Sequence, residues 1–193
     1  ARAVRARGIE RRNHITEAAA AFAMEHGIAA ISHRQVAAAA QVPLGSTTYY
    51  FSSLDELRAA AVERILIGDR ERRRAAIGQG LASDVSATDL AWALIDAVVS
   101  IPRLDDPIQV ALLYERIAEA VRAPELAAVL RAASKEVLAD IETLTAGTDW
   151  ADSDAAALLA LVDGRVIGWL ALGDTRPVLL LEGIASDLAR HQG

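Results

Sequence analysis

Residues 32–57 read SHRQVAAAAQVPLGSTTYYFSSLDEL, and they predict two short helices with a tight turn between them. Ser32 suits the N-cap of a helix over residues 33–40, because its hydroxyl can accept a bond from a free backbone N–H. Pro43 disfavours helical backbone at the residue before it, which marks the turn. Residues 45–51 then predict the second short helix.

These two helices have an apolar side and a polar side. The apolar residues are suited to packing against neighbouring helices, and they are Val36, Ala37, Ala40, Val42, Phe51 and Leu57. The polar residues are small or carry hydroxyls that can reach phosphates or base edges, and they are Gly45, Ser46, Thr48, Tyr49 and Tyr50. A major groove about 12 Å wide admits one helix, which the preceding helix can brace. The pattern therefore predicts a helix-turn-helix, although buried helix pairs can share it.

The chain before this motif predicts one further helix and a basic arm. Apolar residues recur at helical spacing from Ile15 to Ala23, and Gly27 is a natural stop, so we expect a helix over about residues 10–26. Residues 1–12 lack an apolar period, and we expect them to form a flexible basic arm. Residues 1–51 carry six Arg against three Glu, net +3, whereas the rest carries 14 basic against 23 acidic residues, net −9. This asymmetry favours a polyanionic partner for the N-terminal part, but an arginine-rich disordered tail explains it equally well.

The composition of the 193 residues favours an all-α protein, because Ala is abundant and aromatic residues are only 4%. After the motif, the apolar periodicity and the prolines predict helices over about 53–77, 88–101, 107–122, 124–145, 152–172 and 177–190. The absence of cysteine excludes disulfides, thiolate zinc sites and cysteine nucleophiles. No apolar run approaches the ~20 residues of a membrane span and no leader opens the sequence, so we expect a cytoplasmic protein without a membrane partner.

Residues 13–57 resemble the DNA-binding domain of the TetR/AcrR family of bacterial transcriptional repressors. The family pattern has an Ile-x-x-Ala-Ala helix, a Gly, a small-capped helix, a Val turn, Gly-x-x-Tyr-x-x-Phe, and an acidic-x-Leu start to the next helix. The corresponding residues here are Ile15 to Ala19, Gly27, Ser32 to Ala40, Val42, Gly45 to Phe51, and Asp55-Glu56-Leu57. The match covers about a quarter of the chain.

The resemblance implies an N-terminal three-helix DNA-binding domain over residues 1–52 and a helical ligand-binding and dimerisation domain over residues 53–193. It also implies which residues face DNA, and these are Ser32, His33, Arg34, Gly45, Ser46, Thr48, Tyr49 and Tyr50.

Four positions depart from the family pattern. Gln41 stands where the turn usually has Gly, so it either accepts a left-handed backbone or signals an altered turn. Thr47 stands where an apolar residue commonly packs, and Thr48 stands where a Tyr commonly stands. Leu54 stands where a Lys usually holds a phosphate, which removes one expected DNA contact unless the basic N-terminal residues replace it.

The last two predicted helices suggest a homodimer. Residues 152–172 are apolar nearly all round, and such a helix needs burial on more than one side. Two helices from each of two chains would form a four-helix interface, which the resemblance also implies. A monomeric core is the alternative. The expected interface residues are Leu159, Val162, Val166, Leu170, Leu181, Ile184 and Leu188.

An effector pocket is the remaining expectation for the helical domain. Trp92 and Asp96 lie one helical turn apart, and they are candidates together with Tyr114 and Trp169. Each of them is also explained as a core or interface residue. A mostly apolar pocket with one carboxylate favours a cationic or hydrogen-bonding aromatic effector.

The sequence therefore predicts a ligand-responsive repressor that binds palindromic operator DNA as a homodimer. The alternative is a helical small-molecule binding protein without DNA binding. We expect no enzymatic activity, cofactor or metal site, because the four His are scattered and no phosphate loop or serine elbow is present.

Overall fold

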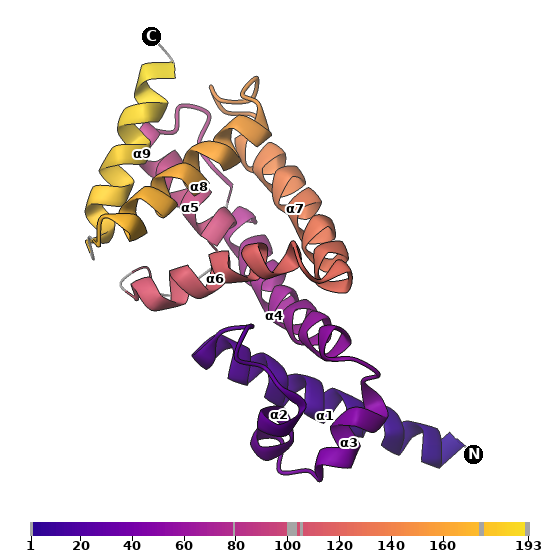
Figure 1. Cartoon of the computed structure of the whole chain (residues 1–193). Coiled ribbons are helices and arrows are strands. Elements are labelled where there is room, and N and C mark those ends of the chain that lie inside the picture. Colours follow the sequence, from indigo (N-terminus) through magenta and orange to yellow (C-terminus); the bar gives the residue numbers. More distant parts are fainter. Residues whose placement is uncertain (1, 79, 100–103, 105, 174–175, 192–193) are drawn as a thin grey trace. The chain divides into compact units, whose positions relative to one another are not determined.

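The computed structural model describes residues 2–78, 80–99, 104, 106–173 and 176–191, with side chains described between Ala6 and Arg190 in those ranges. Every regular element in this part of the chain is an α-helix, which confirms the all-α prediction (Figure 1). The helices are α1 (Arg2–His26), α2 (His33–Ala39), α3 (Leu44–Tyr50), α4 (Leu54–Ile77), α5 (Ala87–Val99), α6 (Pro107–Ala120), α7 (Pro124–Thr145), α8 (Ala155–Ala171) and α9 (Pro177–His191). The bounds of α2 to α9 agree with the sequence prediction within three residues, and the predicted end of the helix at 101 lies outside the described residues.

The chain forms two compact units that do not follow its order. The first unit comprises the residues up to Gly68 together with Leu112–Ala132. The second unit comprises Asp69–Ala111 and Ala133–Gly193. No helix in the described ranges is long and apolar enough to cross a membrane.

Helix α1 begins much earlier than the sequence predicted. The expected flexible arm over residues 1–12 is wrong, because α1 is continuous from Arg2. Ala and Arg are strong helix formers, so this segment has helical propensity although it lacks an apolar stripe. The additional helical residues at the start of α1, which we call the α1 extension, lie beyond α3 in Figure 1.

The core of the first unit joins α1 to α4 with the start of α7. Ile15, Val36, Phe51 and Leu57 are each at most 1% exposed, and Leu126 is fully buried in the same cluster. Each such side chain contributes about 1.5–3 kcal/mol through burial. The apolar face expected for the helix-turn-helix is therefore the face that this core buries.

The turn between α2 and α3 depends on Gln41. Its φ of 53° lies in the left-handed region, so Gln41 takes the backbone conformation that Gly usually supplies. The N–H groups that follow the helix stay paired, since Gln41 donates to the carbonyl of Ala38 and Val42 to that of Ala37. The turn thus has the expected form without glycine.

The turn between α1 and α2 is held by residues distant in sequence. Gly27 ends α1 with a φ of 87°. The two carboxylate oxygens of Glu115, on α6, accept the N–H groups of Ile28 and Ala29 at 3.2 Å each. Arg58 of α4 donates to the carbonyl of Ala29 at 3.0 Å. These bonds fix the point at which the chain enters α2.

In the second unit, α5, α8 and α9 pack on one another. Asp154 caps α8 by accepting the N–H of Ala156 at 2.9 Å. Arg70 and Arg73 of α4 pair with Glu136 and Asp140 of α7, at 2.6 Å in each pair. The side chain of Arg73 is only 4% exposed, and its carboxylate partner compensates for the loss of water.

Candidate nucleic-acid interface

The outward face of α3 consists of small and hydroxyl-bearing residues. Gly45, Thr48 and Tyr49 are exposed, and Tyr49 is 81% exposed. Ser46 and Tyr50 are half-buried beside them. The rings of Tyr49 and Tyr50 meet edge to face with their centroids 5.0 Å apart. This face offers several hydroxyls to a polar partner while α3 adds no charge of its own.

The inward face of α3 anchors it firmly. Thr47, where the family pattern has an apolar residue, is fully buried, and its hydroxyl donates to the carbonyl of Leu44 at 2.8 Å. A buried hydroxyl with a partner avoids the cost of an unpaired polar group. At the end of the helix, Phe51 is 1% exposed, and the guanidinium carbon of Arg12 lies over its ring, 4.6 Å from the ring centroid. These contacts hold α3 in one orientation.

Helix α2 contributes the other predicted contacts. Ser32 caps it by accepting the N–H of Gln35 at 3.3 Å, and its hydroxyl donates to the Gln35 side chain at 2.6 Å. Arg34 is exposed and open to a partner. His33 is half-buried, and its Nδ1 atom is buried without a hydrogen-bond partner among the described residues.

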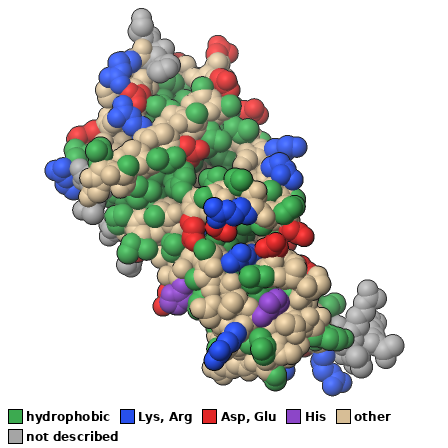
Figure 2. Space-filling view, viewed as in Figure 1, with side chains coloured by type: hydrophobic (Ala, Val, Ile, Leu, Met, Phe, Trp, Pro, Cys, Tyr) green, Lys and Arg blue, Asp and Glu red, His purple; other side chains and the backbone are tan. Residues whose placement is uncertain are grey.

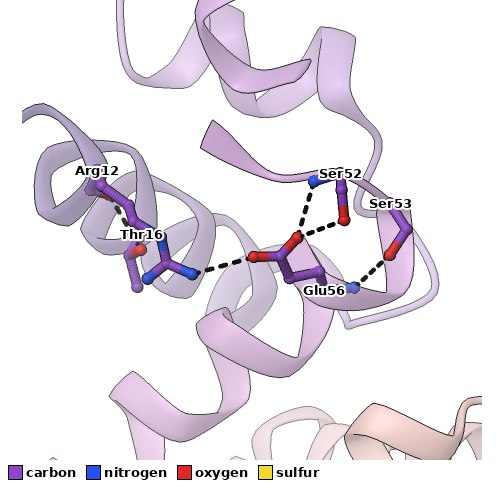
Figure 3. Close-up of polar contacts among 5 residues, drawn as sticks. All are labelled: Arg12, Thr16, Ser52, Ser53 and Glu56. Carbon is purple, nitrogen blue, oxygen red and sulfur yellow. Dashed lines mark hydrogen bonds and ion pairs between the residues drawn. The ribbon is translucent and has the colours of Figure 1, made fainter. Parts of the chain in front are cut away.

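The start of α4 is tied to α1 through Glu56 (Figure 3). Glu56 accepts the N–H of Ser52 at 2.7 Å and its hydroxyl at 2.8 Å, while Ser53 caps the helix by accepting the N–H of Glu56 at 3.0 Å. Arg12 donates to the other carboxylate oxygen at 3.2 Å. The hydrogen bonds from the Ser52 N–H, the Ser52 hydroxyl and then Arg12 favour the carboxylate, so they hold the pKa of Glu56 below its ordinary value.

Leu54, which stands where the family pattern has a Lys, makes a packing contact. It is half-buried and lies against the core of the first unit. Asp55 and Glu56 follow it in the first turn of α4, so this turn presents acidic rather than basic groups.

The predicted effector residues fall into two groups. Trp92, 50% exposed, and Asp96, also exposed, lie one turn apart on α5. Trp169 on α8 is 5% exposed, and its Nε1 has no hydrogen-bond partner among the described residues. These three belong to the second unit, whereas Tyr114 is a half-buried residue of the first.

The predicted interface residues lie mostly inside the chain. Leu159 and Leu170 are half-buried. The other five are at most 5% exposed within one chain, and they are Val162, Val166, Leu181, Ile184 and Leu188.

Other apolar residues of α8, its C-cap and α9 are exposed, and they are not among the predicted interface residues. Ile167 and Leu172 are 51% and 85% exposed, and Val178 and Leu179 are 53% and 39% exposed. On the face drawn in Figure 2, hydrophobic side chains gather over α8 and α9 of the second unit. Composition alone does not distinguish these exposed residues from the buried ones, because α8 is apolar nearly all round.

Within the described residues, no group of three His, Asp or Glu side chains is arranged to hold a metal ion.

Comparison with known proteins identifies the family. The tetracyclin repressor-like C-terminal domain model matches residues 85–190, which is more than half of the chain. The multidrug binding protein EbrR, solved with proflavin, is 32% identical over 93% of this chain and 98% of its own, with a TM-score of 0.67. A TetR-family member from Streptomyces coelicolor A3 is 32% identical over 92% and 97% of the two chains, with a TM-score of 0.62.

A transcriptional regulator from Rhodococcus sp. Rha1 shares the fold, with a TM-score of 0.71 at 24% identity over 93% and 94% of the two chains. Among curated proteins, none matches the chain. The resemblance seen in residues 13–57 and the match over residues 85–190 agree, and together they place this chain in the TetR family of transcriptional regulators.

Proposed function

We propose that this chain is a repressor that binds palindromic operator DNA as a homodimer and leaves it when a planar aromatic cation binds. The observation that carries the proposal is the outward face of α3, which is polar, exposed and rigidly anchored by Thr47 and Phe51. Residues 1–52 are its DNA-binding domain, and residues 53–193 bind the effector and the second subunit.

In the proposed complex, α3 lies in the major groove and α2 crosses the backbone. Gly45 allows close approach, since a Cβ built there meets nothing within 4 Å on the protein side. Ser46, Thr48 and Tyr49 offer hydroxyls to base edges and phosphates, and Arg34 adds one charge-assisted contact. Ser32, His33 and Tyr50 are half-buried, and they lie at the edge of the proposed DNA-binding surface.

The proposed dimer forms through α8 and α9. The exposed side chains of Ile167, Leu172, Val178 and Leu179 supply an apolar contact surface. The buried residues predicted earlier, such as Val166 and Ile184, support these helices from within the chain. A two-fold dimer presents two copies of α3 to two half-sites, about 34–36 Å apart along the duplex.

The proposed effector is a planar aromatic cation. EbrR, which is 31–32% identical to this chain, has been solved with proflavin and with ethidium. On α5, Trp92 offers an aromatic face and Asp96 a carboxylate one turn away. Trp169, in the same unit, has an indole N–H without a hydrogen-bond partner among the described residues.

Release follows if the effector and DNA favour different arrangements of the two subunits. An effector-induced movement of α4 would shift the two copies of α3 out of register with their half-sites. Linkage then requires that DNA weaken effector binding by the same factor, on the order of 5–150-fold. An effector that bound both arrangements equally would release nothing.

The test is fluorescence anisotropy with labelled DNA from immediately upstream of this chain's own coding sequence, with and without ethidium. We expect salt-dependent binding that ethidium reverses, and weaker binding to a duplex in which one half-site is scrambled. Ethidium binding without any DNA binding would instead identify a helical small-molecule binding protein. The packing of Leu54 in place of a phosphate-binding Lys is the feature that favours this second function.

A further inference from the structure

An open cleft of about 880 Å³ lies between the N-terminal half of α1 and the two tyrosines of α3. Arg7, Arg11 and His14 recur at i, i+4 and i+7, so they share one side of α1. Tyr49 and Tyr50 line the cleft from α3. Its remaining lining residues are Gly8, Ile9, Glu10 and Arg12.

Helix α1 passes close to Tyr50 at Gly8. A Cβ built at Gly8 would lie 4.0 Å from the Tyr50 hydroxyl, which is an ordinary van der Waals distance. On the same side of α1 as Arg7 and Arg11, His14 connects α1 to α2. Its Nε2 lies 2.8 Å from the carbonyl oxygen of Ala40, the residue that caps the end of α2. The cleft is thus built on the same helices that orient α3.

The charges in the cleft differ in how they are engaged. Arg12 is paired with Glu56 at 3.2 Å and lies over Phe51. Arg7 and Arg11 are exposed and make no ion pair with any described residue. Glu10 is the only acid among the described residues that line the cleft. Two unpaired guanidinium groups in an open cleft beside hydroxyls suit an anion with several oxygens, such as a phosphodiester.

We propose that this cleft holds a segment of DNA sugar–phosphate backbone next to the groove that α3 reads, with Arg7 and Arg11 as its phosphate-binding cations. The inference rests on the proposed function and adds a binding site to it. Arg7 and Arg11 are separated by one helical turn, a rise of about 6 Å, so the two can reach different phosphates of one strand.

This site compensates for the start of α4. Leu54 packs into the core there, and Asp55 and Glu56 make the first helical turn acidic. A duplex seated on α3 therefore receives no cation from that turn. The α1 extension supplies two cations on the side of α3 that carries Tyr49 and Tyr50. The N-terminal helix, rather than the fourth helix, then fixes the duplex against α3.

The test compares Arg7→Ala, Arg11→Ala and the double variant with Arg131→Ala, an exposed arginine of the first unit that lies outside the cleft. DNA binding is measured by anisotropy between 50 and 200 mM salt on the upstream duplex and on a duplex of unrelated sequence. We expect the slope of log K against log[salt] to become shallower by about 0.9 for each cleft arginine removed, on both duplexes. Arg131→Ala should keep the slope of the parent. The double variant with Arg7→Lys and Arg11→Lys should have a slope closer to that of the parent than to that of the double alanine variant. Circular dichroism and ethidium affinity report whether the variants remain folded.

Unchanged slopes in the double variant, with the parent bound to its operator, overturn the cleft proposal and leave the proposed function standing. In a second outcome, the parent binds both duplexes equally, while the slope of log K against log[salt] becomes shallower in the cleft variants. This result supports the cleft and contradicts operator recognition. A parent that binds neither duplex overturns both.

Discussion

The carboxylate of Glu115 occupies the space in which a side chain at Gly27 would begin. A Cβ at residue 27 would lie 3.0 Å from Oε1 of Glu115 and closer still to Oε2. The same carboxylate accepts the N–H groups of Ile28 and Ala29. The absence of a side chain at residue 27 therefore lets α6 hold the turn that leads into the helix-turn-helix.

Gly27→Ala should destabilise the protein through two effects. Ala at a φ of 87° carries roughly 1–2 kcal/mol of backbone strain, and its methyl group also displaces the Glu115 carboxylate. Gly147→Ala is the matched control, because Gly147 has a φ of 78° with open space around it. Urea unfolding should show a greater loss for Gly27→Ala than for Gly147→Ala. Equal losses of unfolding free energy in the two variants would mean that the Glu115 side chain moves aside without destabilising the protein.

Glu56→Gln should remove part of the acid sensitivity of the first unit. The pKa of Glu56 is lowered in the folded chain by the Ser52 N–H, the Ser52 hydroxyl and Arg12. A lowered folded-state pKa gives stability that is present above the unfolded value and lost as the pH falls through the folded one. Thermal melts from pH 7 to pH 3 should therefore show a shallower decline for Glu56→Gln below about pH 4.5. An identical pH profile in parent and variant would contradict this role.

Ile167→Asp should separate the proposed dimer without unfolding the subunit. Ile167 is 51% exposed in one chain, so the charge harms only a surface that a second chain covers. Sedimentation at micromolar concentration should give twice 20.5 kDa for the parent and 20.5 kDa for the variant. Val166→Asp is a poor substitute, because Val166 is fully buried and its loss would unfold the second unit. Val121→Asp, at 88% exposure on a different unit, should leave the parent mass unchanged.

Ser46→Ala and Tyr49→Ala should weaken operator binding while leaving the melting temperature near that of the parent. Tyr49 is 81% exposed and Ser46 half-buried, and neither belongs to the buried core. A single neutral hydrogen bond is worth about 0.5–1.5 kcal/mol, so the ratio of operator to unrelated-DNA affinity should fall about 2- to 12-fold where base contact is lost. Anisotropy on both duplexes measures that ratio. Parent-like ratios in both variants would rule out α3 as the DNA-reading helix.

Asp96→Asn should lower ethidium affinity modestly and leave operator affinity unchanged in the absence of dye. An exposed ion pair is typically worth about 0.2–1 kcal/mol, so the expected loss is at most about fivefold. Trp92→Ala should lower dye affinity through loss of the aromatic face. Fluorescence titration with ethidium measures both effects. A matching loss of dye and DNA affinity in Asp96→Asn would identify Asp96 as a structural residue.

Local signals in the sequence predicted the helix-turn-helix well. Ser32 caps α2 and Pro43 marks the turn, and both act within a few residues of their own position. The family resemblance raised the possibility that Gln41 takes a left-handed conformation, and its φ of 53° confirms that alternative. The sequence prediction placed the start of α1 too late, because residues 1–12 have no apolar periodicity. Helical propensity in an Ala- and Arg-rich segment needs no apolar stripe.

Long-range pairings were beyond the sequence. Nothing near Glu115 indicates that it binds a turn 86 and 87 residues earlier in the chain. The apolar character of α8 predicted burial, but it did not show which side α5 and α9 cover. Val162 and Ile167 are equally apolar in sequence, yet one is fully buried and the other half exposed. Faces of an evenly apolar helix are distinguished by its neighbours rather than by its own residues.

The inclusion of Leu126 in the first hydrophobic core has a consequence for synthesis on the ribosome. The four N-terminal helices emerge first, but Ala123 and Leu126 complete the cluster that contains Ile15 and Phe51. At roughly 5–20 residues per second, the chain between α3 and Leu126 takes about 4–15 s to make. During that time the nascent helices lack a full core, so a fragment that stops after α4 should be a target for chaperones and proteases rather than a free DNA-binding module.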